Sequence, residues 1–384
     1  MKSNGYICFA GSDWWYHNRN HFDVRMMEVF ARDAKVLLIN SIVMQRPNIA
    51  EGIMFARRIV RKAKSICRGL KRTELGFWVY SPMSLPVHHV RSLRPVNRML
   101  VRRQIRLISR KLGILNPIVW VACPAACEIS IEMSRRGLIY QRTDYFEELP
   151  NVDTQVIAEY DRKLRASADL TLYVNKELYK EELSGCREAV YLGQGVKYEM
   201  FASADRSNGV PADIAEIPKP IIGFFGQIDD YTVDIELLRT VAARLSDMSF
   251  VLIGPTQTNI SRLTCLPNVH FLGPRPYTEI PKYGASFDVG IMPWLQNKWI
   301  KYCSPVKLKE YLALGLPVVT TPISAADEYR ELLYIVSGPD EFADAVRNAL
   351  VFNDAKAIWR RRESVRSESW ELKAAKVLEL LEKK

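Results

Sequence analysis

Three polar residues in one short segment, Ser304, Lys307 and Glu310, have the types and the spacing needed to bind a nucleotide. The segment predicts a short helix with Ser304 as N-cap and Pro305 at its first position, ending at Gly315. A helix start binds anions, and a lysine in the first turn opposes the macrodipole by about 0.3–1 kcal/mol unless an anion lies there too. A phosphate against Ser304 and Lys307, with sugar hydroxyls donating to Glu310, would satisfy all three side chains. The alternative is a surface helix with a Lys307–Glu310 pair.

The elements around this segment place it at the ligand-binding edge of an α/β sheet. Residues 287–294 predict a buried strand, so the helix would open from the carboxyl end of that strand, where open parallel sheets bind ligands. Three more strands, at 221–225, 250–253 and 269–272, end at glycines, which let the backbone approach a phosphate closely. These glycines are Gly226, Gly254 and Gly273. We expect a nucleotide crevice here, with at least one of the glycines in an ordinary turn.

The first half of the chain predicts a second parallel sheet. Apolar strands alternate with helical stretches such as 22–32, 128–136 and 152–166, a pattern typical of a doubly wound sheet covered on both faces. The expected strands lie at 6–10, 35–40, 118–123, 137–142 and 170–175. Residues 203–220 are rich in Ser, Asp, Pro and Ala without apolar periodicity, and they are the expected linker between domains at 1–202 and 221–353.

The composition allows two cores and indicates a cytoplasmic protein. The chain has 384 residues, 48% of them hydrophobic, and single cores stop growing at about 250–300 residues. The apolar run at 6–10 is too short for a signal peptide, and no window approaches 18 apolar residues. Seven cysteines are scattered without metal-like pairing, and we expect Cys123 and Cys127 to pack a helix start.

The basic residues are concentrated in one part of the chain. Residues 51–115 contain 16 Lys and Arg against Glu51 and Glu74, a local net charge of +14 in a chain whose total is +11. Residues 51–72 predict an amphipathic basic helix, and a second helix repeats arginine every four residues, at Arg98, Arg102, Arg106 and Arg110. Arginines four apart repel each other unless an anion screens them, so the patch implies an anionic partner, which could be a membrane surface, nucleic acid or an acidic substrate. Of these we expect an anionic membrane surface. Solvated helix faces are the alternative.

Residues 310–319, Glu-Tyr-Leu-Ala-x-Gly-x-Pro-Val-Val, resemble the nucleotide-sugar-binding motif of GT-B glycosyltransferases, particularly enzymes of bacterial polysaccharide synthesis. Glu310 matches the glutamate that holds the ribose, whereas Tyr302 stands where many relatives have another glutamate. Xanthan glucuronosyltransferase-like enzymes also lack that first glutamate and keep a lysine at the position of Lys307. The resemblance implies an α/β GT-B fold, with two Rossmann-like domains facing across a cleft and a C-terminal helix at 354–384 crossing back to the first domain.

The resemblance also implies how a donor would be held. Many relatives have an arginine at the position of Gln227, which shifts charge neutralisation of the diphosphate toward Lys307 and backbone amides. Tyr277 would lie near the base. No Asp-x-Asp motif is evident, and we expect Asp229 and Asp230 to form a solvated loop pair, so the expectation is a UDP-sugar donor with no metal and no cofactor.

Residues 140–144, Tyr-Gln-Arg-Thr-Asp, resemble the Tyr-x-x-x-Asp of the xanthan glucuronosyltransferase-like enzymes, whose aspartate is the base of an inverting reaction. Asp144 is therefore the expected general base, although a helix cap or loop carboxylate is the alternative. Asp13 is the reserve candidate, with His21 behind it. Both belong to a polar and aromatic loop at 11–21 that could line a cleft or merely cover the end of the sheet.

The expected protein is a glycosyltransferase that moves a sugar from a nucleotide sugar to a lipid-linked or other glycan acceptor. It would work in cell-surface polysaccharide synthesis, peripherally bound to the cytoplasmic face of the membrane. Two alternatives stay open. A GT-B-shaped sugar-nucleotide epimerase would also need the crevice, and a nucleic-acid-binding protein would also be basic, although no aromatic interleaving or known binding motif accompanies the charge.

Overall fold

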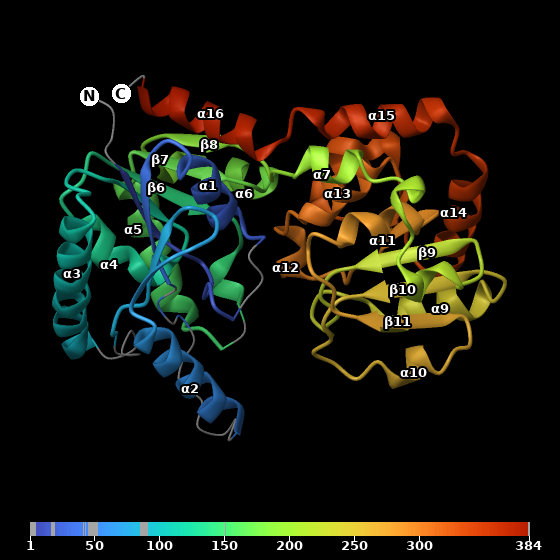
Figure 1. Ribbon diagram of the computed structural model, residues 1–384, viewed down its shortest axis with the longest axis horizontal. Coiled ribbons are helices and arrows are strands. Elements are labelled where there is room, and N and C mark those ends of the chain that lie inside the picture. Colours follow the sequence, from blue (N-terminus) through green and yellow to red (C-terminus); the bar gives the residue numbers. More distant parts are fainter. Residues whose placement is uncertain are drawn as a thin grey trace. The chain divides into compact units, whose positions relative to one another are not determined.

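The computed structural model describes residues 5–16, 20–40, 42, 44, 53–84, 91–149 and 151–382. The chain divides into two compact units, one formed by Met1–Gly193 with Lys373–Lys384 and one by Gln194–Leu372. Each unit is built on its own parallel-dominated sheet with helices packed on it (Figure 1), so the predicted α/β class is confirmed. The division falls earlier than the segment expected as linker. Residues 203–220 lie inside the second unit, where Ile214 joins the hydrophobic core.

The sheet of the first unit has eight strands in the order β3-β4-β2-β1-β5-β6-β7-β8. All neighbours are parallel except β3 and β4. The strands are β1 (Gly5–Phe9), β2 (Lys35–Ile39), β3 (Leu70–Arg72), β4 (Trp78–Tyr80), β5 (Ile118–Val121), β6 (Gly137–Arg142), β7 (Leu170–Tyr173) and β8 (Ala189–Tyr191).

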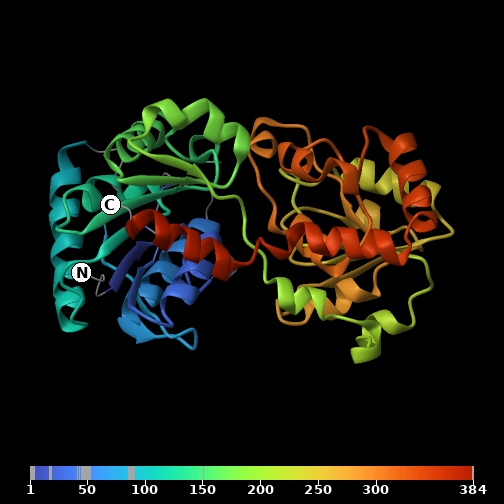
Figure 2. The ribbon, with the colours of Figure 1, turned by 90° about the horizontal axis from the view of Figure 1, so that it is seen from above.

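Helices flank this sheet, and α3 lies at the outside of the unit in both ribbon views (Figure 2). They are α1 (Phe22–Phe30), α2 (Ile53–Cys67), α3 (Arg94–Lys111), α4 (Cys127–Ile131), α5 (Thr154–Ser167) and α6 (Lys176–Glu182). The predicted basic helix at 51–72 is too long. Gly69 has a left-handed φ of 60°, which stops α2 and lets residues 70–72 form β3 against β4.

The second unit has a six-stranded, all-parallel sheet in the order β11-β10-β9-β12-β13-β14. The order reverses at β9, between β10 and β12, and such a switch point is where open α/β sheets bind ligands. The strands are β9 (Ile221–Phe225), β10 (Ser249–Ile253), β11 (Val269–Gly273), β12 (Val289–Met292), β13 (Val318–Thr320) and β14 (Leu333–Ile335). Apolar clusters cover both faces of the sheet.

Two short helices of this unit precede β9, and the other helices follow its strands in sequence. Together they are α7 (Tyr198–Ala202), α8 (Ala212–Ala215), α9 (Ile235–Arg244), α10 (Ser261–Thr264), α11 (Ile280–Ser286), α12 (Lys298–Lys301), α13 (Val306–Leu314), α14 (Pro339–Val351) and α15 (Ala355–Arg366). The last helix, α16 (Trp370–Glu382), starts in the second unit and belongs to the first from Lys373 onward. Throughout the described ranges, no helix has the length and apolar character needed to cross a bilayer.

Candidate active site

The helix α13 carries Lys307 and Glu310, but it begins one residue later than predicted. Pro305 is the N-cap residue, with φ −73° and ψ 124°, and no side chain caps the helix. The extended backbone at Pro305 keeps Ser304 outside the helix, so the prediction of Ser304 as N-cap and Pro305 as first helical residue was wrong. The end is as predicted. Gly315 adopts the left-handed conformation at φ 82°, and a side chain there would press on Ile358, 2.6 Å away.

Lys307 projects from the first turn of α13 onto the end of β9. Its Nζ lies where a side chain on Gly226 would be, 2.4 Å from the position of that missing Cβ. The ammonium also faces two aromatic rings, at 4.0 Å from the ring centroid of Phe224 and 5.4 Å from that of Trp294. Burial lowers the pKa of Lys307 to about 8, although the charges of Glu310, Cys303 and Asp229 act in the opposite direction.

The polar atoms around Lys307 are not fully paired. Within the described part of the chain, no hydrogen bond or ion pair to Lys307 Nζ is present, and the buried Trp294 Nε1 has no hydrogen-bond partner. Buried polar groups are almost always paired, so an unpaired indole donor beside a desolvated ammonium is the arrangement expected at a site for an anionic or acceptor-rich ligand.

Two glycines at neighbouring strand ends leave the backbone bare beside this ammonium. Gly226 and Gly254 have φ values of 135° and 146°, which side chains rarely tolerate. A Cβ on Gly254 would lie 1.9 Å from the carbonyl oxygen of Gly226, so these two backbones touch. Gly273, the last residue of β11, differs, because a Cβ there would meet nothing within 4 Å and no close approach requires a glycine.

Glu310 lies deep in the unit rather than on a surface. Its side chain is buried, at 3% exposure, and its Oε1 accepts a hydrogen bond of 2.7 Å from the hydroxyl of Tyr277. Residues 308–314 of α13 are all buried, so the alternative of a solvent-exposed Lys307–Glu310 pair is wrong. The structure thus joins two residues that the sequence singled out 33 positions apart.

The loop after β9 is shaped by an aspartate. Asp229 is buried and accepts hydrogen bonds from the amides of Tyr231 and Thr232 and from Nε2 of Gln227, at 2.9 Å for the last. The expectation of a solvated pair is therefore wrong for Asp229 and holds for the exposed Asp230. Tyr302, which stands at the position of the relatives' first glutamate, is also buried, and its hydroxyl lies 3.0 Å from Lys301 Nζ.

Asp144 follows β6 in the first unit, on a turn whose backbone is hydrogen-bonded to Arg142. Its carbonyl oxygen accepts a hydrogen bond of 3.1 Å from Nη1 of Arg142. Burial raises the pKa of the Asp144 carboxyl, opposed by the charge of His21, a hydrogen bond from Thr143 and the charge of Arg142. The structure therefore brings Asp144 near His21, and a carboxylate with a raised pKa is a stronger base than an ordinary aspartate.

Asp13, the reserve candidate, serves the packing of α2. Its Oδ2 accepts from the hydroxyl of Ser65 at 3.0 Å, and its Oδ1 accepts from the amide of Trp15 at 2.9 Å. Ser65 in turn lies 2.7 Å from Ser81 in a buried network that anchors the basic helix to the sheet. The neighbouring Trp14 is buried against Phe77, with the rings 5.1 Å apart, so this part of the loop covers the sheet end.

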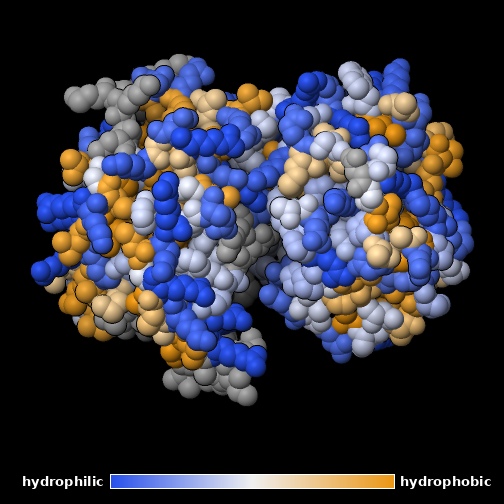
Figure 3. Space-filling view, viewed as in Figure 1, coloured by the Kyte–Doolittle hydropathy of each residue, from blue (hydrophilic) through white to orange (hydrophobic). Residues whose placement is uncertain are grey.

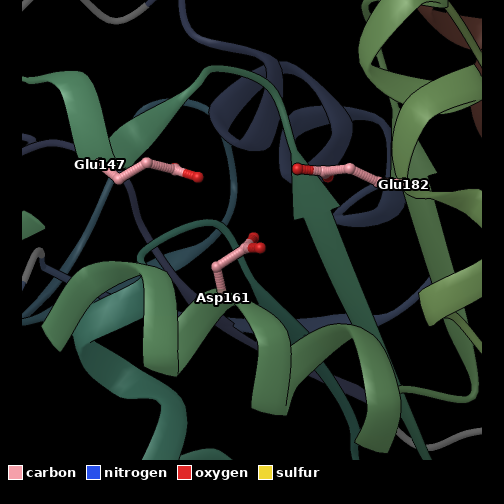
Figure 4. A group of neighbouring side chains, drawn as sticks. All are labelled: Glu147, Asp161 and Glu182. Carbon is pink, nitrogen blue, oxygen red and sulfur yellow. The ribbon is translucent and has the colours of Figure 1, made fainter. Parts of the chain in front are cut away.

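Three carboxylates meet near Asp144, a cluster that sequence patterns did not reveal. Ligand oxygens of Glu147, Asp161 and Glu182 lie within 4.8 Å of one another and point toward one centre (Figure 4). The guanidinium of Arg142 occupies that centre, so a side-chain cation takes the place that a metal ion would need. An arginine at the end of a buried strand was the signal that could have indicated the cluster.

Known proteins resemble this chain in sequence and in fold. Residues 219–351 match the family model described as "Glycosyl transferases group 1". A Bacillus subtilis (strain 168) protein, whose name assigns it to teichuronic acid biosynthesis as the glycosyltransferase TuaH, is 28% identical over 273 residues, which cover 66% of this chain and 68% of that protein.

Solved structures define the fold. Sucrose-phosphate synthase from Thermosynechococcus elongatus superposes with a TM-score of 0.71 at 12% identity, over 99% of this chain and 98% of that one. Anabaena HepE in complex with UDP and glucose gives 0.68 at 12% identity, over 99% and 100% of the two chains. The protein has the GT-B fold of these glycosyltransferase structures. It carries a glycosyltransferase group 1 domain in its second unit, so the resemblance seen in residues 310–319 is confirmed.

Proposed function

We propose that this glycosyltransferase uses a UDP-sugar and transfers the sugar to a lipid-linked glycan acceptor in cell-surface polysaccharide synthesis. The main support for a nucleotide-sugar donor is the Lys307 ammonium, which is desolvated and has no ion pair in the described structure. It lies beside the backbone of Gly226, which no side chain covers. HepE is described in complex with UDP-glucose, and TuaH is named for teichuronic acid synthesis, which supports the donor and the pathway class.

The donor is held by one face of α13 and the strand ends beside it. Lys307 and the amides of the helix start neutralise the diphosphate, and Gly226 and Gly254 let it approach the backbone. Glu310, oriented by the hydroxyl of Tyr277, accepts the ribose hydroxyls. On our assignment, Gln227 and Tyr302 complete the donor site, and Ser304 contributes only backbone atoms to it. The reaction requires no metal ion or cofactor.

The transfer follows an inverting course with Asp144 as general base. The acceptor hydroxyl attacks the anomeric carbon while Asp144 takes its proton, the bond from that carbon to the diphosphate oxygen breaks, and the new glycosidic bond forms on the opposite face. The leaving diphosphate keeps the electron pair, and the positive charge of Lys307 stabilises it. His21 lies near Asp144 and tunes its charge, whereas Asp13 is occupied in holding α2.

The same first unit binds the cytoplasmic face of an anionic membrane through α2 and α3. Arg103, Arg106 and Arg110 of α3 are exposed, and the apolar Met99 and Leu107 beside them are 68% and 59% exposed. Figure 3 shows hydrophilic and hydrophobic side chains interspersed over this part of the molecule. A lipid interface accepts both kinds of side chain, whereas a nucleic-acid backbone offers only charge, so the mixture favours a membrane.

The arginine row of α3 is not uniform in the structure. Arg98 and Arg102 form ion pairs with Glu132, with Nη1 of Arg98 at 3.0 Å, so the expected repulsion along the row is relieved at that end. The membrane-binding set is therefore narrowed to Arg103, Arg106 and Arg110, together with exposed residues of α2 such as Arg57 and Arg58.

The proposal is tested by stability measurements with nucleotides and by product analysis. Ligand at about 100 times its Kd stabilises by about 2.7 kcal/mol, so UDP should raise the melting temperature by a few degrees. Lys307→Ala should remove that shift, and Lys282→Ala, at an exposed lysine on α11, should keep it. A UDP-sugar incubated alone should yield no sugar isomer, because an isomer would indicate the epimerase alternative. Equal stabilisation of wild type and Lys307→Ala would place the donor elsewhere.

A further inference from the structure

We propose that Arg142 is a positioning residue for the general base. Its guanidinium, clamped by Glu147, Asp161 and Glu182, fixes the turn that carries Asp144. The inference rests on the proposed function, because it assumes that Asp144 accepts the proton of the acceptor. It goes further by assigning a task to a buried charged cluster of the first unit, whereas the donor-binding helix α13 belongs to the second unit.

The partners of Arg142 come from the turn after β6, from α5 and from α6. Arg142 ends β6 and is fully buried, at 0% exposure. Nη1 and Nη2 donate to the two oxygens of Glu147 at 2.9 and 3.0 Å, Nη2 also donates to Glu182 at 2.9 Å, and Nε lies 3.2 Å from Asp161. Nη1 then donates to the carbonyl oxygen of Asp144 at 3.1 Å. One planar side chain thus joins β6, the turn after it, α5 and α6.

The carboxylates around the guanidinium are themselves held in place. The hydroxyl of Tyr140 donates to Asp161 at 2.7 Å, and that of Tyr173 donates to Glu182 at 3.2 Å. Arg165 Nε lies 2.7 Å from Asp161. Three carboxylates and two guanidinium groups share the cluster, so it keeps one net negative charge. Every member is paired, and the guanidinium has little freedom to move.

A purely structural task would not require this arrangement. Buried ion pairs often stabilise a fold no better than apolar side chains of similar volume, because desolvating the charges offsets their attraction. What apolar residues cannot do is donate to the Asp144 carbonyl in a fixed direction. The fork of arginine can hold Glu147 with two bonds and Asp144 with a third, which sets the orientation of the turn.

The cluster also sets the charge that Asp144 experiences. His21, Thr143 and Arg142 all favour the ionised carboxylate, against the effect of burial. Glu147, Asp161 and Glu182 offset the charge of Arg142. Removing one of these carboxylates should therefore strengthen the effect of the Arg142 charge on Asp144. The pKa of Asp144 should then fall, so that it takes up its proton at a lower pH.

The test compares charge-neutralising variants inside the cluster with charge-neutralising variants at exposed positions of α5 and α6. Glu147→Gln and Glu182→Gln each remove a partner of Arg142. Glu159→Gln on α5 and Glu177→Gln on α6 remove the same charge from exposed pairs with Lys163 and Lys180. We expect the first two to lower kcat by about 10- to 100-fold, since misplacement by about 1 Å costs that much, with donor KM unchanged. In both variants the acid side of the plot of kcat against pH should move to lower pH. The two controls should behave as wild type.

A second readout does not depend on catalysis. Carbodiimide labelling of Asp144, followed by peptide mass spectrometry across pH, reports its protonation and access directly. In Glu147→Gln the labelling curve should move to lower pH, and in Glu159→Gln it should not. Arg142→Lys keeps the charge but not the fork, so it should lose kcat as well. If Arg142→Lys does not fold, the Glu147→Gln and Glu182→Gln variants decide whether Arg142 positions Asp144.

The outcomes separate the two hypotheses. If Glu147→Gln and Glu182→Gln fold and match their controls in kcat, acid limb and labelling, Arg142 only supports the fold and the inference is overturned. If the labelling curve moves but Asp144→Asn retains turnover, Arg142 does position the turn and the assignment of Asp144 as base is wrong.

Discussion

The Nζ of Lys307 occupies the space that a side chain on Gly226 would fill, 2.4 Å from the position of its missing Cβ. The end of strand β9 and the first turn of α13 therefore pack together only because residue 226 has no side chain. The glycine makes room for the ammonium, and the ammonium lies where an approaching diphosphate would meet bare backbone. Changes at either residue should therefore alter the same binding step.

Gly226→Ala should displace Lys307 and weaken UDP binding by at least about tenfold, in addition to a strain cost of about 1–3 kcal/mol at a φ of 135°. Gly273→Ala is the control, because φ is 71° there but a Cβ meets nothing within 4 Å. Both variants should lose thermal stability, and only Gly226→Ala should lose affinity in calorimetry. Equal affinity of the two alanine variants would mean that Lys307 does not contact the ligand.

UDP binding should weaken as pH rises through the pKa of Lys307, which burial lowers to about 8. Above that pH the free site is neutral, so binding the diphosphate must take up a proton, whereas at about pH 7 the ammonium is already charged. Affinity measured by calorimetry should fall from about pH 7 to about pH 8.5, with proton uptake visible as a dependence on buffer ionisation enthalpy. Lys307→Arg stays charged and should remove both effects.

The same pKa shift predicts a change in the stability of the free protein. Because the folded pKa of Lys307 lies below its ordinary value of about 10.4, the unfolded chain binds more protons between those two pH values. This residue's contribution to the free energy of unfolding therefore rises with pH across that window. Denaturant titrations of wild type and Lys307→Met should diverge with pH there, and parallel curves would contradict the shift.

Tyr277→Phe should weaken donor binding through Glu310. Losing the hydroxyl removes the 2.7 Å hydrogen bond that orients the buried carboxylate, at a net cost of about 1 kcal/mol. UDP affinity should fall several-fold, and Glu310→Ala should lose more because the ribose hydroxyls lose their acceptor. Tyr334→Phe, at a half-buried tyrosine of β14, is the control. A Glu310→Ala protein that binds UDP like wild type would remove Glu310 from the site.

Asp144→Asn should lower kcat by about 10²–10⁴-fold while UDP binding stays unchanged, because the amide keeps the shape and loses the basicity. Asp13→Asn should instead lower thermal stability, since Asp13 holds Ser65 of α2. Steady-state kinetics and melting curves separate the two. Turnover of Asp144→Asn within a few-fold of wild type would favour a retaining mechanism.

Replacing Arg103, Arg106 and Arg110 by Gln should release the protein from anionic vesicles at moderate salt. Each basic residue near such a surface contributes about 1 kcal/mol, so three are enough to change the bound fraction. Lys356, Arg360 and Arg366 of α15 provide an equal charge change as control. Co-sedimentation measures the effect. If both triple variants sediment alike, α3 does not bind the membrane.

Local interactions explain which predictions from the sequence succeeded. The strands that end at glycines and the helix that stops at Gly315 depend on neighbouring residues, since φ preferences and apolar periodicity act over a few positions. Predictions that placed the boundary of a helix from local preference alone were wrong at two helix ends. Pro305 stayed extended and Ser304 did not cap α13, and Gly69 stopped α2 before residues 70–72 paired as a strand.

The sequence by itself determined the two α/β units and the segment that carries Lys307 and Glu310. The tertiary structure decided which atoms meet there. Lys307 reaches Gly226, Tyr277 reaches Glu310, and Arg142 gathers carboxylates as distant along the chain as Glu182, 40 positions away. Such pairings depend on the order of strands in the sheet and on burial, which strengthens and orients polar contacts between residues that no periodicity relates.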